Sequence, residues 1–314
     1  MRTKNSKIIN SEQDIFRNKV IPIKFLSNYN NEILKKPQWM KIKFPVSTNK
    51  IKNLTLILRQ HNLNTVCEQA LCPNLAECFN RGTATFMILG SICTRRCPFC
   101  AVSHGKPSLV NKNEPQQLAR VIFDMKINYV VITSVVRDDL KDRGAQHFSN
   151  CIQEIRNKNN VKIEILVPDF RGMMRESCKI ISMNPPNVFN HNLENVPRLY
   201  KLIRPGASYI RSLKLLEFFK KLNPNVPTKS GLILGLGETY KEIVHVINDL
   251  LDHGVTILTI GQYLQPSSKH FPVQKYITPD EFKKIKNYAL SIGFKKVFCG
   301  PLIRSSYHAE KYFE

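Results

Sequence analysis

The chain has 314 residues, of which 42% are hydrophobic and 23% are charged, and its net charge is +23. These values are typical of a globular protein with a sizeable core, and no apolar run reaches the roughly 20 residues that a membrane helix needs. No charged-then-apolar signal segment precedes a cleavage-like site, so we expect an intracellular, cytoplasmic protein with no membrane partner.

The positive charge has two interpretations. Lys and Asn are plentiful throughout, as an A/T-biased genome would produce, and the charge would then be a solvated surface. Alternatively, it attracts an acidic macromolecule, either nucleic acid or protein. Net charge bears on association rather than on fold, so both interpretations stay open at this point.

Four segments follow one another along the chain. Residues 1–35 are predicted to be a loosely ordered basic arm, and 36–82 an extension that carries a helix over Lys50–His61 and the only tryptophan, Trp39, as an anchor. Residues 83–277 are predicted to form the main domain, and 278–314 a closing helix and tail.

The main domain alternates β-rich runs with amphipathic helical stripes, which predicts an α/β fold with a parallel sheet and helices outside. Six units fall short of the eight that close a barrel, so we expect an open, six-stranded (β/α)6 partial barrel. A flat, doubly wound sheet is the alternative. The six runs are Ala84–Leu89, Tyr129–Thr133, Val161–Val167, Asn187–Asn190, Lys229–Leu234 and Ile257–Tyr263.

The last predicted helix has well-marked ends. Thr278 is the expected N-cap, Pro279 opens the first turn, and Glu281 stands at the capping-box position. Gly293 ends the helix. A short tail follows, and we expect it to cover the site together with the N-terminal arm.

Two groups of three cysteines carry the chemistry. Cys93, Cys97 and Cys100 (C-x3-C-x2-C) lie in a loop after the first run, where parallel α/β folds build active sites. Cys67, Cys72 and Cys78 (C-x4-C-x5-C) precede that run. Iron–sulfur clusters and zinc both prefer four ligands, so each triad leaves one position open. A structural zinc or cluster site is the alternative for either triad.

The first motif resembles the radical S-adenosylmethionine superfamily, and the chain from about Lys36 to Ala309 resembles the lipoyl synthase family. Val136, Ala101 and Arg211 depart from the family pattern, but none is an expected cluster ligand. Besides the two triads, the matching stretches are Thr133–Val135, Arg137–Leu140, Pro168–Gly172, Phe189–Asn192 with Glu194, Gly235–Thr239, Gly261–Pro266 and Arg304–Ala309.

The resemblance implies two 4Fe–4S clusters and S-adenosylmethionine as cofactors. It assigns Cys93, Cys97 and Cys100 to the cluster that binds S-adenosylmethionine. It assigns Cys67, Cys72, Cys78 and Ser306 to an auxiliary cluster that is the sulfur source. An alkoxide is a harder ligand than a thiolate, which suits a cluster that is taken apart.

For the S-adenosylmethionine pocket, the resemblance implies three groups of residues, each with strand-end packing or a helix cap as the alternative. Thr133, Ser134 and Arg137 would meet the amino acid part of the cofactor. Asn190, Asn192 and Glu194 would meet the ribose, and Gln262 the adenine.

The implied reaction inserts sulfur at carbons 6 and 8 of an octanoyl chain on a lysine of a lipoyl carrier domain. The implied partners are 2-oxoacid dehydrogenase acyltransferase subunits, the glycine cleavage H protein, an electron donor such as flavodoxin or ferredoxin, and cluster-assembly proteins. Nucleic acid is not expected. Two alternatives are a methylthiotransferase acting on transfer RNA and a non-enzymatic iron–sulfur protein that binds nucleic acid.

Overall fold

The computed structural model describes residues 34–40, 56, 58, 61, 63–66, 74, 77–78, 83–307 and 309. The predicted arm and most of the helix expected over 50–61 lie outside these residues. Near the start of the described part, Met40 is buried while Trp39 is 45% exposed. The expectation that Trp39 anchors this segment is therefore wrong, because its neighbour takes the buried position.

One sheet organises the molecule, with its strands in chain order from β1 to β8. Seven strands, β2 to β8, run parallel, and β1 pairs with β2 in the antiparallel sense. No pairing between β1 and β8 closes the sheet within the described part of the chain. The strands are β1 (Asn64–Thr65), β2 (Thr83–Ile88), β3 (Tyr129–Ser134), β4 (Lys162–Leu166), β5 (Val188–Asn190), β6 (Thr228–Leu234), β7 (Ile257–Gln262) and β8 (Lys296–Gly300).

The open α/β partial barrel is confirmed, and β2 to β7 match the six predicted runs within two residues. The sheet adds a seventh parallel strand, β8, which pairs with β7. Its run is short and directly precedes the tail, so its sequence pattern is weak.

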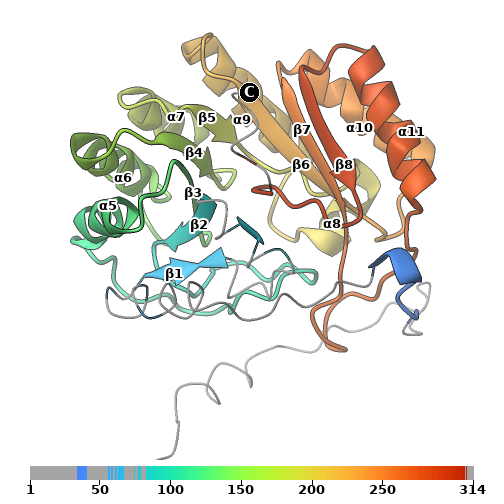
Figure 1. The fold of residues 1–314 in the computed structure, drawn as a ribbon, viewed down its shortest axis with the longest axis horizontal. Helices are drawn as coiled ribbons and strands as arrows, with labels where there is room; N and C mark the ends of the chain where they lie inside the picture. Colours follow the sequence, from blue (N-terminus) through green and yellow to red (C-terminus); the bar gives the residue numbers. More distant parts are fainter. Residues whose placement is uncertain are drawn as a thin grey trace, which may run out of the picture.

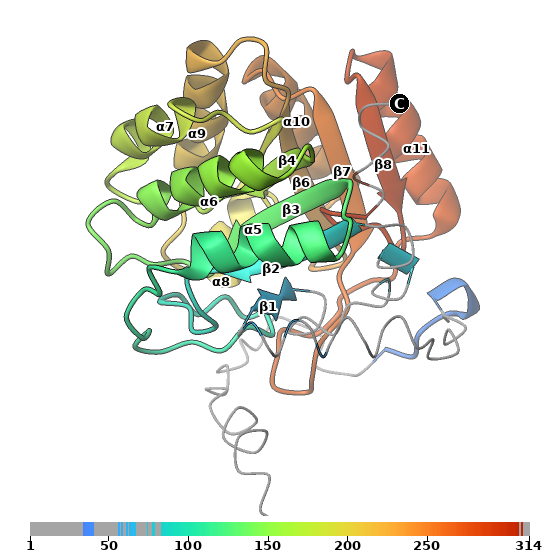
Figure 2. The same ribbon diagram turned by 60° about the vertical axis from the view of Figure 1, so that its left-hand side comes forward.

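Helices cover the outer side of the curved sheet (Figure 1). Turned by 60°, the molecule shows α5 and α6 side by side along that surface (Figure 2). No helix in the described ranges is long and apolar enough to cross a bilayer. The helices are α5 (Glu114–Asp124), α6 (Ala145–Lys158), α7 (Met174–Ser182), α8 (Tyr200–Ile203), α9 (Tyr209–Leu222), α10 (Tyr240–Asp252) and α11 (Pro279–Ser291), with 3-10 turns η1 (Gln38–Met40) and η2 (Pro197–Leu199).

The predicted ends of α11 are confirmed. The Thr278 side chain accepts a hydrogen bond from the Glu281 amide, and the Glu281 carboxylate accepts one from the Thr278 amide. Both orphan amides of the first turn are thereby satisfied. Gly293 follows the helix with φ +118°, a left-handed conformation that favours glycine.

Alternation along the strands divides the core into two layers. Val130 and Ile132 of β3 belong to the large layer beneath the helices. The intervening Tyr129 and Val131 point the other way, because successive side chains of a strand alternate between faces. On this inner face they pack with Val188, Ile257 and the tail residue Ala309.

Candidate active site at the carboxyl edge of the sheet

The loop that carries Cys93, Cys97 and Cys100 follows β2 and is held by main-chain hydrogen bonds. The Cys93 amide donates to Ser103 O at 2.8 Å, and the Gly105 amide donates to Cys93 O at 3.0 Å. Thr94 reaches across to the end of β3, where its amide and hydroxyl both donate to Val136 O. The loop is therefore folded back on itself and fastened to the neighbouring strand.

The Cys97 and Cys100 thiols lie close enough to Cys93 for its charge to raise the pKa of both. Burial, with the charges of neighbouring thiolates, raises the pKa of the Cys97 thiol to about 11 and that of Cys100 to about 12, although the Arg204 charge opposes the shift at Cys97. Burial also raises the pKa of Cys93. Buried thiols of this kind stay protonated unless a metal takes the place of the proton.

The donor set of the triad, three thiols on one loop, is of the kind that holds an iron–sulfur cluster. Within the described residues, no three His, Cys, Asp or Glu side chains converge closely enough to hold one metal ion. A 4Fe–4S cluster binds each thiolate at a different iron and does not need that convergence. The free thiols of Cys93, Cys97 and Cys100 are the ligand type that the predicted cluster requires.

Arg95, inside the cysteine loop, belongs to a group of four charged side chains that we call the edge cluster: Arg95, Asp138, Asp169 and Arg211. Arg95 donates from Nε and Nη2 to both Asp138 oxygens, at 2.7 and 2.9 Å, and from Nη2 to Asp169 Oδ1 at 2.7 Å. Arg211 donates to Asp169 Oδ2 from the other side at 2.8 and 2.9 Å. Burial raises the pKa of Asp169, but the bond to Arg95 and the neighbouring positive charges outweigh it and lower the pKa to about 2.

The three residues predicted at the end of β3 differ in their contacts. The Thr133 hydroxyl donates to Leu166 O at 2.9 Å. Among the residues that the structure describes, none forms a hydrogen bond with the buried Ser134 hydroxyl. Arg137 is 3% exposed, and its guanidinium donates to Leu89 O, Ser108 O and the Asp139 carboxylate. Arg137 thus secures loops on either side of the cysteine motif, whereas Ser134 offers an unused polar group.

Asn190, Asn192 and Glu194 follow β5 and do lie together. Glu194 has φ +68°, a strained conformation for a residue other than glycine and one found often at functional sites. Burial raises the pKa of its carboxyl, which the Arg204 charge and a bond from Asn192 oppose. The Glu194 charge in turn acts on Cys97 and Cys100, so this segment faces the cysteine loop.

Gln262 makes a full set of bonds within the chain. Its Nε2 donates to Tyr263 O and Lys275 O at 3.1 and 3.0 Å, and its Oε1 accepts from the Ile277 amide at 2.8 Å. A Cβ at Gly235 would lie 2.2 Å from Gln262 Nε2, so only glycine permits this approach. A contact between Gln262 and a cofactor would have to replace one of these bonds.

The triad of Cys67, Cys72 and Cys78 lies mostly outside the described residues. Only Cys78 is described, and it is buried. The tail meets the segment around Cys78 at two points. Asn74 Nδ2 donates to Leu302 O at 2.7 Å, and the Tyr307 hydroxyl donates to Glu77 Oε2 at 2.9 Å. Ser306 is adjacent to Tyr307 and partly exposed, so it lies in a part of the tail that is bonded to the segment around Cys78.

Sequence reasoning assigned no role to a second charged group, on the inner face of the sheet. We call it the inner cluster: Tyr129, Glu164, Asn190 and Lys229. Glu164 and Lys229 are fully buried, and Lys229 Nζ lies 2.8 Å from Glu164 Oε1. Charged residues inside otherwise apolar strand runs were the available signal, because such residues are seldom buried without a partner.

Comparison with known proteins identifies the family. Residues 87–250 match the family model of the Radical SAM superfamily. The chain is 61% identical over 294 residues to a lipoyl synthase of Buchnera aphidicola subsp. Cinara cedri, covering 94% of this chain and 95% of the relative. It is 60% identical over 292 residues to a lipoyl synthase of Pectobacterium carotovorum, covering 93% and 91%.

Solved structures support the fold alone, since identities are low. SuiB of Streptococcus suis, bound to precursor peptide SuiA, has a TM-score of 0.55 at 13% identity, over 79% of this chain and 52% of SuiB. Methylornithine synthase (PylB) has a TM-score of 0.52 at 12% identity, over 79% and 81%. Given a superfamily match across the cysteine loop and relatives about 60% identical over nearly its whole length, this chain belongs to the lipoyl synthase family.

Proposed function

We propose that the chain is a sulfurtransferase that inserts sulfur at carbons 6 and 8 of an octanoyl chain carried on a lysine of a lipoyl carrier domain. The observation that carries this proposal is a series of interactions that leads from the cysteine loop to the segment around Cys78. Glu194 acts on Cys97 and Cys100, Asn192 bonds to Glu194, and the Ser305 hydroxyl donates to Asn192 Oδ1 at 3.1 Å.

Two residues further along the tail, Tyr307 bonds to Glu77, the neighbour of Cys78. A substrate placed at this point would lie between the cysteine loop after β2 and the segment that carries Cys78. Sulfur transfer from one cluster, driven by the other, requires that arrangement, whereas a purely structural cluster does not.

The residues present suit the proposed cofactors. When bound, the cluster on Cys93, Cys97 and Cys100 supplies an electron to S-adenosylmethionine, and the auxiliary cluster on Cys67, Cys72, Cys78 and Ser306 supplies sulfur. The edge cluster holds the cysteine loop in one orientation, because a guanidinium with bidentate bonds has little freedom to turn.

For S-adenosylmethionine, the unpartnered Ser134 hydroxyl and Asn190 Oδ1 support the proposed pocket. Buried polar atoms are rarely left unsatisfied, so a ligand that bonds to them stabilises the site. We assign Ser134 to the amino acid part and Asn190, Asn192 and Glu194 to the ribose, with Thr133 and Arg137 shaping the edge of the pocket.

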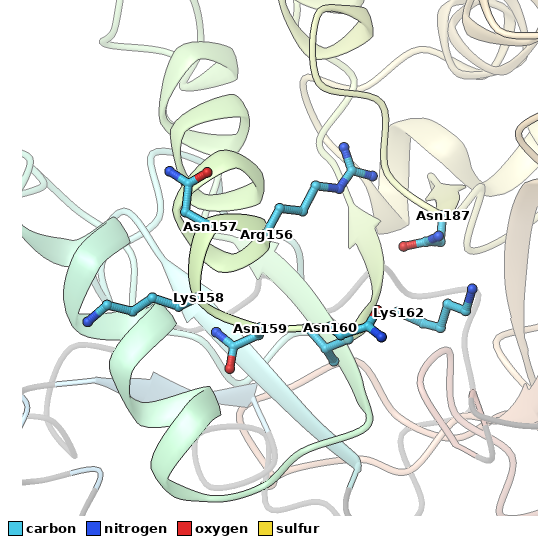
Figure 3. Close-up of a pocket in the computed structure, with 8 residues that line it drawn as sticks. Arg156, Asn157, Lys158, Asn159, Asn160, Lys162 and Asn187 are labelled. Carbon is cyan, nitrogen blue, oxygen red and sulfur yellow. The ribbon is translucent and has the colours of Figure 1, made fainter.

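We propose that an acidic carrier domain docks at the carboxyl edge of the sheet. A basic hollow also lies at the opposite edge, where α6 ends and β4 begins, and it is lined by Arg156, Lys158 and Lys162 (Figure 3). An octanoyl chain delivered there would meet the far ends of the strands, so we do not assign the carrier to it. A flavodoxin- or ferredoxin-type donor, cluster-assembly proteins and a cytoplasmic location complete the proposal.

The test is an anaerobic reaction of reconstituted protein with dithionite, S-adenosylmethionine and an octanoyl-lysyl peptide, followed by mass spectrometry. We expect a product that has gained two sulfur atoms. Cys67→Ala should abolish sulfur gain and retain 5′-deoxyadenosine formation. Cys299→Ala, which changes a cysteine of β8, should leave both unaffected. Cofactor cleavage by the wild type without sulfur gain would contradict the proposal and favour another substrate, with RNA tested first.

A further inference from the structure

The inner cluster touches the C-terminal tail. Lys229 Nζ donates to Ser305 O as well as to Glu164. Asn190 Nδ2 donates to Glu164 Oε1 at 2.7 Å and to the Ser305 hydroxyl at 2.9 Å. The Tyr129 hydroxyl donates to Glu164 Oε2 at 2.9 Å. Ser305 is thus held by both its main chain and its side chain, one residue before Ser306.

The rest of the tail follows the inner face of the sheet, as Figure 1 shows in red. At Gly261 of β7, an added Cβ would lie 2.0 Å from Ile303 O, so the tail main chain packs directly on the strand. Further on, Ala309 is fully buried against Tyr129, Val131 and Ile257. The described residues of the tail therefore lie inside the partial barrel at Ile303, Ser305 and Ala309, and Ser305 makes the polar contacts.

Stability alone does not account for an ion pair at this position. Replacing a buried pair by apolar residues of similar size is often neutral or stabilising, because both charges lose their hydration on burial. What Glu164 and Lys229 provide is a fixed cation beside the Ser305 carbonyl. An apolar pair would remove the charged donor from that carbonyl. The tail would then no longer be fixed at one position along the inner face of the sheet.

We infer that Lys229 and Glu164 are positioning residues for the auxiliary cluster, acting through Ser305 to set the reach of the Ser306 hydroxyl. This inference rests on the proposed role of Ser306. The ion pair between Glu164 of β4 and Lys229 of β6, on the inner face of the sheet, would thus fix the position of Ser306 in the tail.

The test uses the full chain with both charges removed together, Glu164→Gln with Lys229→Met, so that neither is left buried and unpaired. In the cluster-free protein, hydrogen exchange of the tail amides is read by mass spectrometry over 301–309, where the Ile303 and Tyr307 amides are hydrogen-bonded. Loss of a hydrogen bond from a charged donor should speed their exchange by about ten- to a hundredfold. Tyr209→Phe, which removes a buried bond to Asp249 between α9 and α10, is the matched control and should leave tail exchange unchanged.

After reconstitution, the double variant should keep cleavage of S-adenosylmethionine, lose sulfur insertion, and show the auxiliary-cluster Mössbauer signature of Ser306→Ala. Wild-type tail exchange in a folded double variant overturns the inference. If Ser306→Ala leaves the auxiliary cluster unchanged, the proposed ligand fails instead, and tail exchange still decides whether the ion pair seats the tail.

Should the double variant fail to fold, Ser305→Ala and Ala309→Asp test the same seat from the tail, without removing a charge from the sheet. Both should accelerate exchange over 301–309. Unchanged exchange in both overturns the inference.

Discussion

The edge cluster and the inner cluster bury charge in different ways. In the edge cluster two arginines share two aspartates, and the outer members, Asp138 and Arg211, keep 25% and 26% of their side chains exposed. In the inner cluster one lysine meets one glutamate, both are fully buried, and neutral Tyr129 and Asn190 complete the carboxylate's bonds.

The two clusters bury charge differently because the edge cluster holds the cysteine loop, whereas the inner cluster holds the C-terminal tail. A planar guanidinium with forked bonds fixes orientation, which a loop that aims three thiols requires. A lysine ammonium is a compact charge with three donors, suited to one carboxylate oxygen and one main-chain carbonyl. Because the charges are shared, the loss of an outer member, Asp138 or Arg211, should cost little stability. The loss of Asp169, which bonds to both arginines, should cost much more.

Asp169 is that centre, and its neutralisation should have the largest effect. Asp169→Asn leaves Arg95 and Arg211 facing an amide, and breaking a buried ionic contact of this kind costs about 3–5 kcal/mol of unfolding free energy. We expect that loss in urea unfolding, together with reduced cleavage of S-adenosylmethionine, because Arg95 belongs to the cysteine loop. Asp138→Asn should cost less, and equal losses for the two variants would contradict the assignment of Asp169 as the centre.

The second prediction concerns pH and His191, which lies close enough to the edge cluster for Asp169 and Arg95 to affect its charge. Burial, and then the Arg204 charge, lower the pKa of His191 to about 4. Its Nδ1 lies 2.7 Å from Val167 O, which can only accept, so Nδ1 carries the proton and Nε2 accepts from the Ser212 hydroxyl at 2.9 Å.

The folded pKa lies below the unfolded value of about 6.5, so the stabilising contribution is complete above that pH and is lost as pH falls toward 4. The size of the shift corresponds to about 3 kcal/mol. Urea unfolding of wild type and His191→Gln between pH 7 and 4.5 should show a steeper decline in the wild type. Parallel curves would mean that His191 is not held neutral.

Sequence periodicity predicted β2 to β7 because buried parallel strands are dense in β-branched and apolar residues. It placed Cys299 in a strand-like run but did not count that run as a strand of the sheet, since Val297–Cys299 is short and directly precedes the tail. For the site, cysteine spacing and strand ends indicated the correct edge of the sheet. The clusters could not be found this way, because Arg95 meets Asp169 across 74 positions and Glu164 meets Lys229 across 65.

Local sequence carries no record of such pairings. A charged residue within each of the β4 and β6 runs indicates that a buried partner exists, but it does not identify that partner. Predicting the tail contact would have required knowing that Ala309 packs inside the sheet, and its surroundings come from three separate strands.

The third prediction sharpens the account of the inner cluster without removing a charge. Tyr129→Phe deletes one hydroxyl and leaves Glu164 Oε2 without its donor. Hydrogen bonds to charged groups contribute roughly 1.5–3 kcal/mol, and a loss of about 2 kcal/mol in urea unfolding is expected. Tail exchange should rise less than in the double variant, since Lys229 still reaches Ser305. A Tyr129→Phe variant as stable as wild type would show that water replaces the hydroxyl.

The smallest effect is expected for Arg211→Ala, and it tests charge sharing most directly. Arg211 is partly exposed, and Asp169 keeps its bond to Arg95, so about 1 kcal/mol of stability should be lost. Cleavage of S-adenosylmethionine should stay near wild type, because the cysteine loop is tied through Arg95. A loss as large as that of Asp169→Asn would mean that both arginines are needed at once. The edge cluster would then resemble the inner cluster, in which stability is expected to depend on the pairing of Lys229 with Glu164.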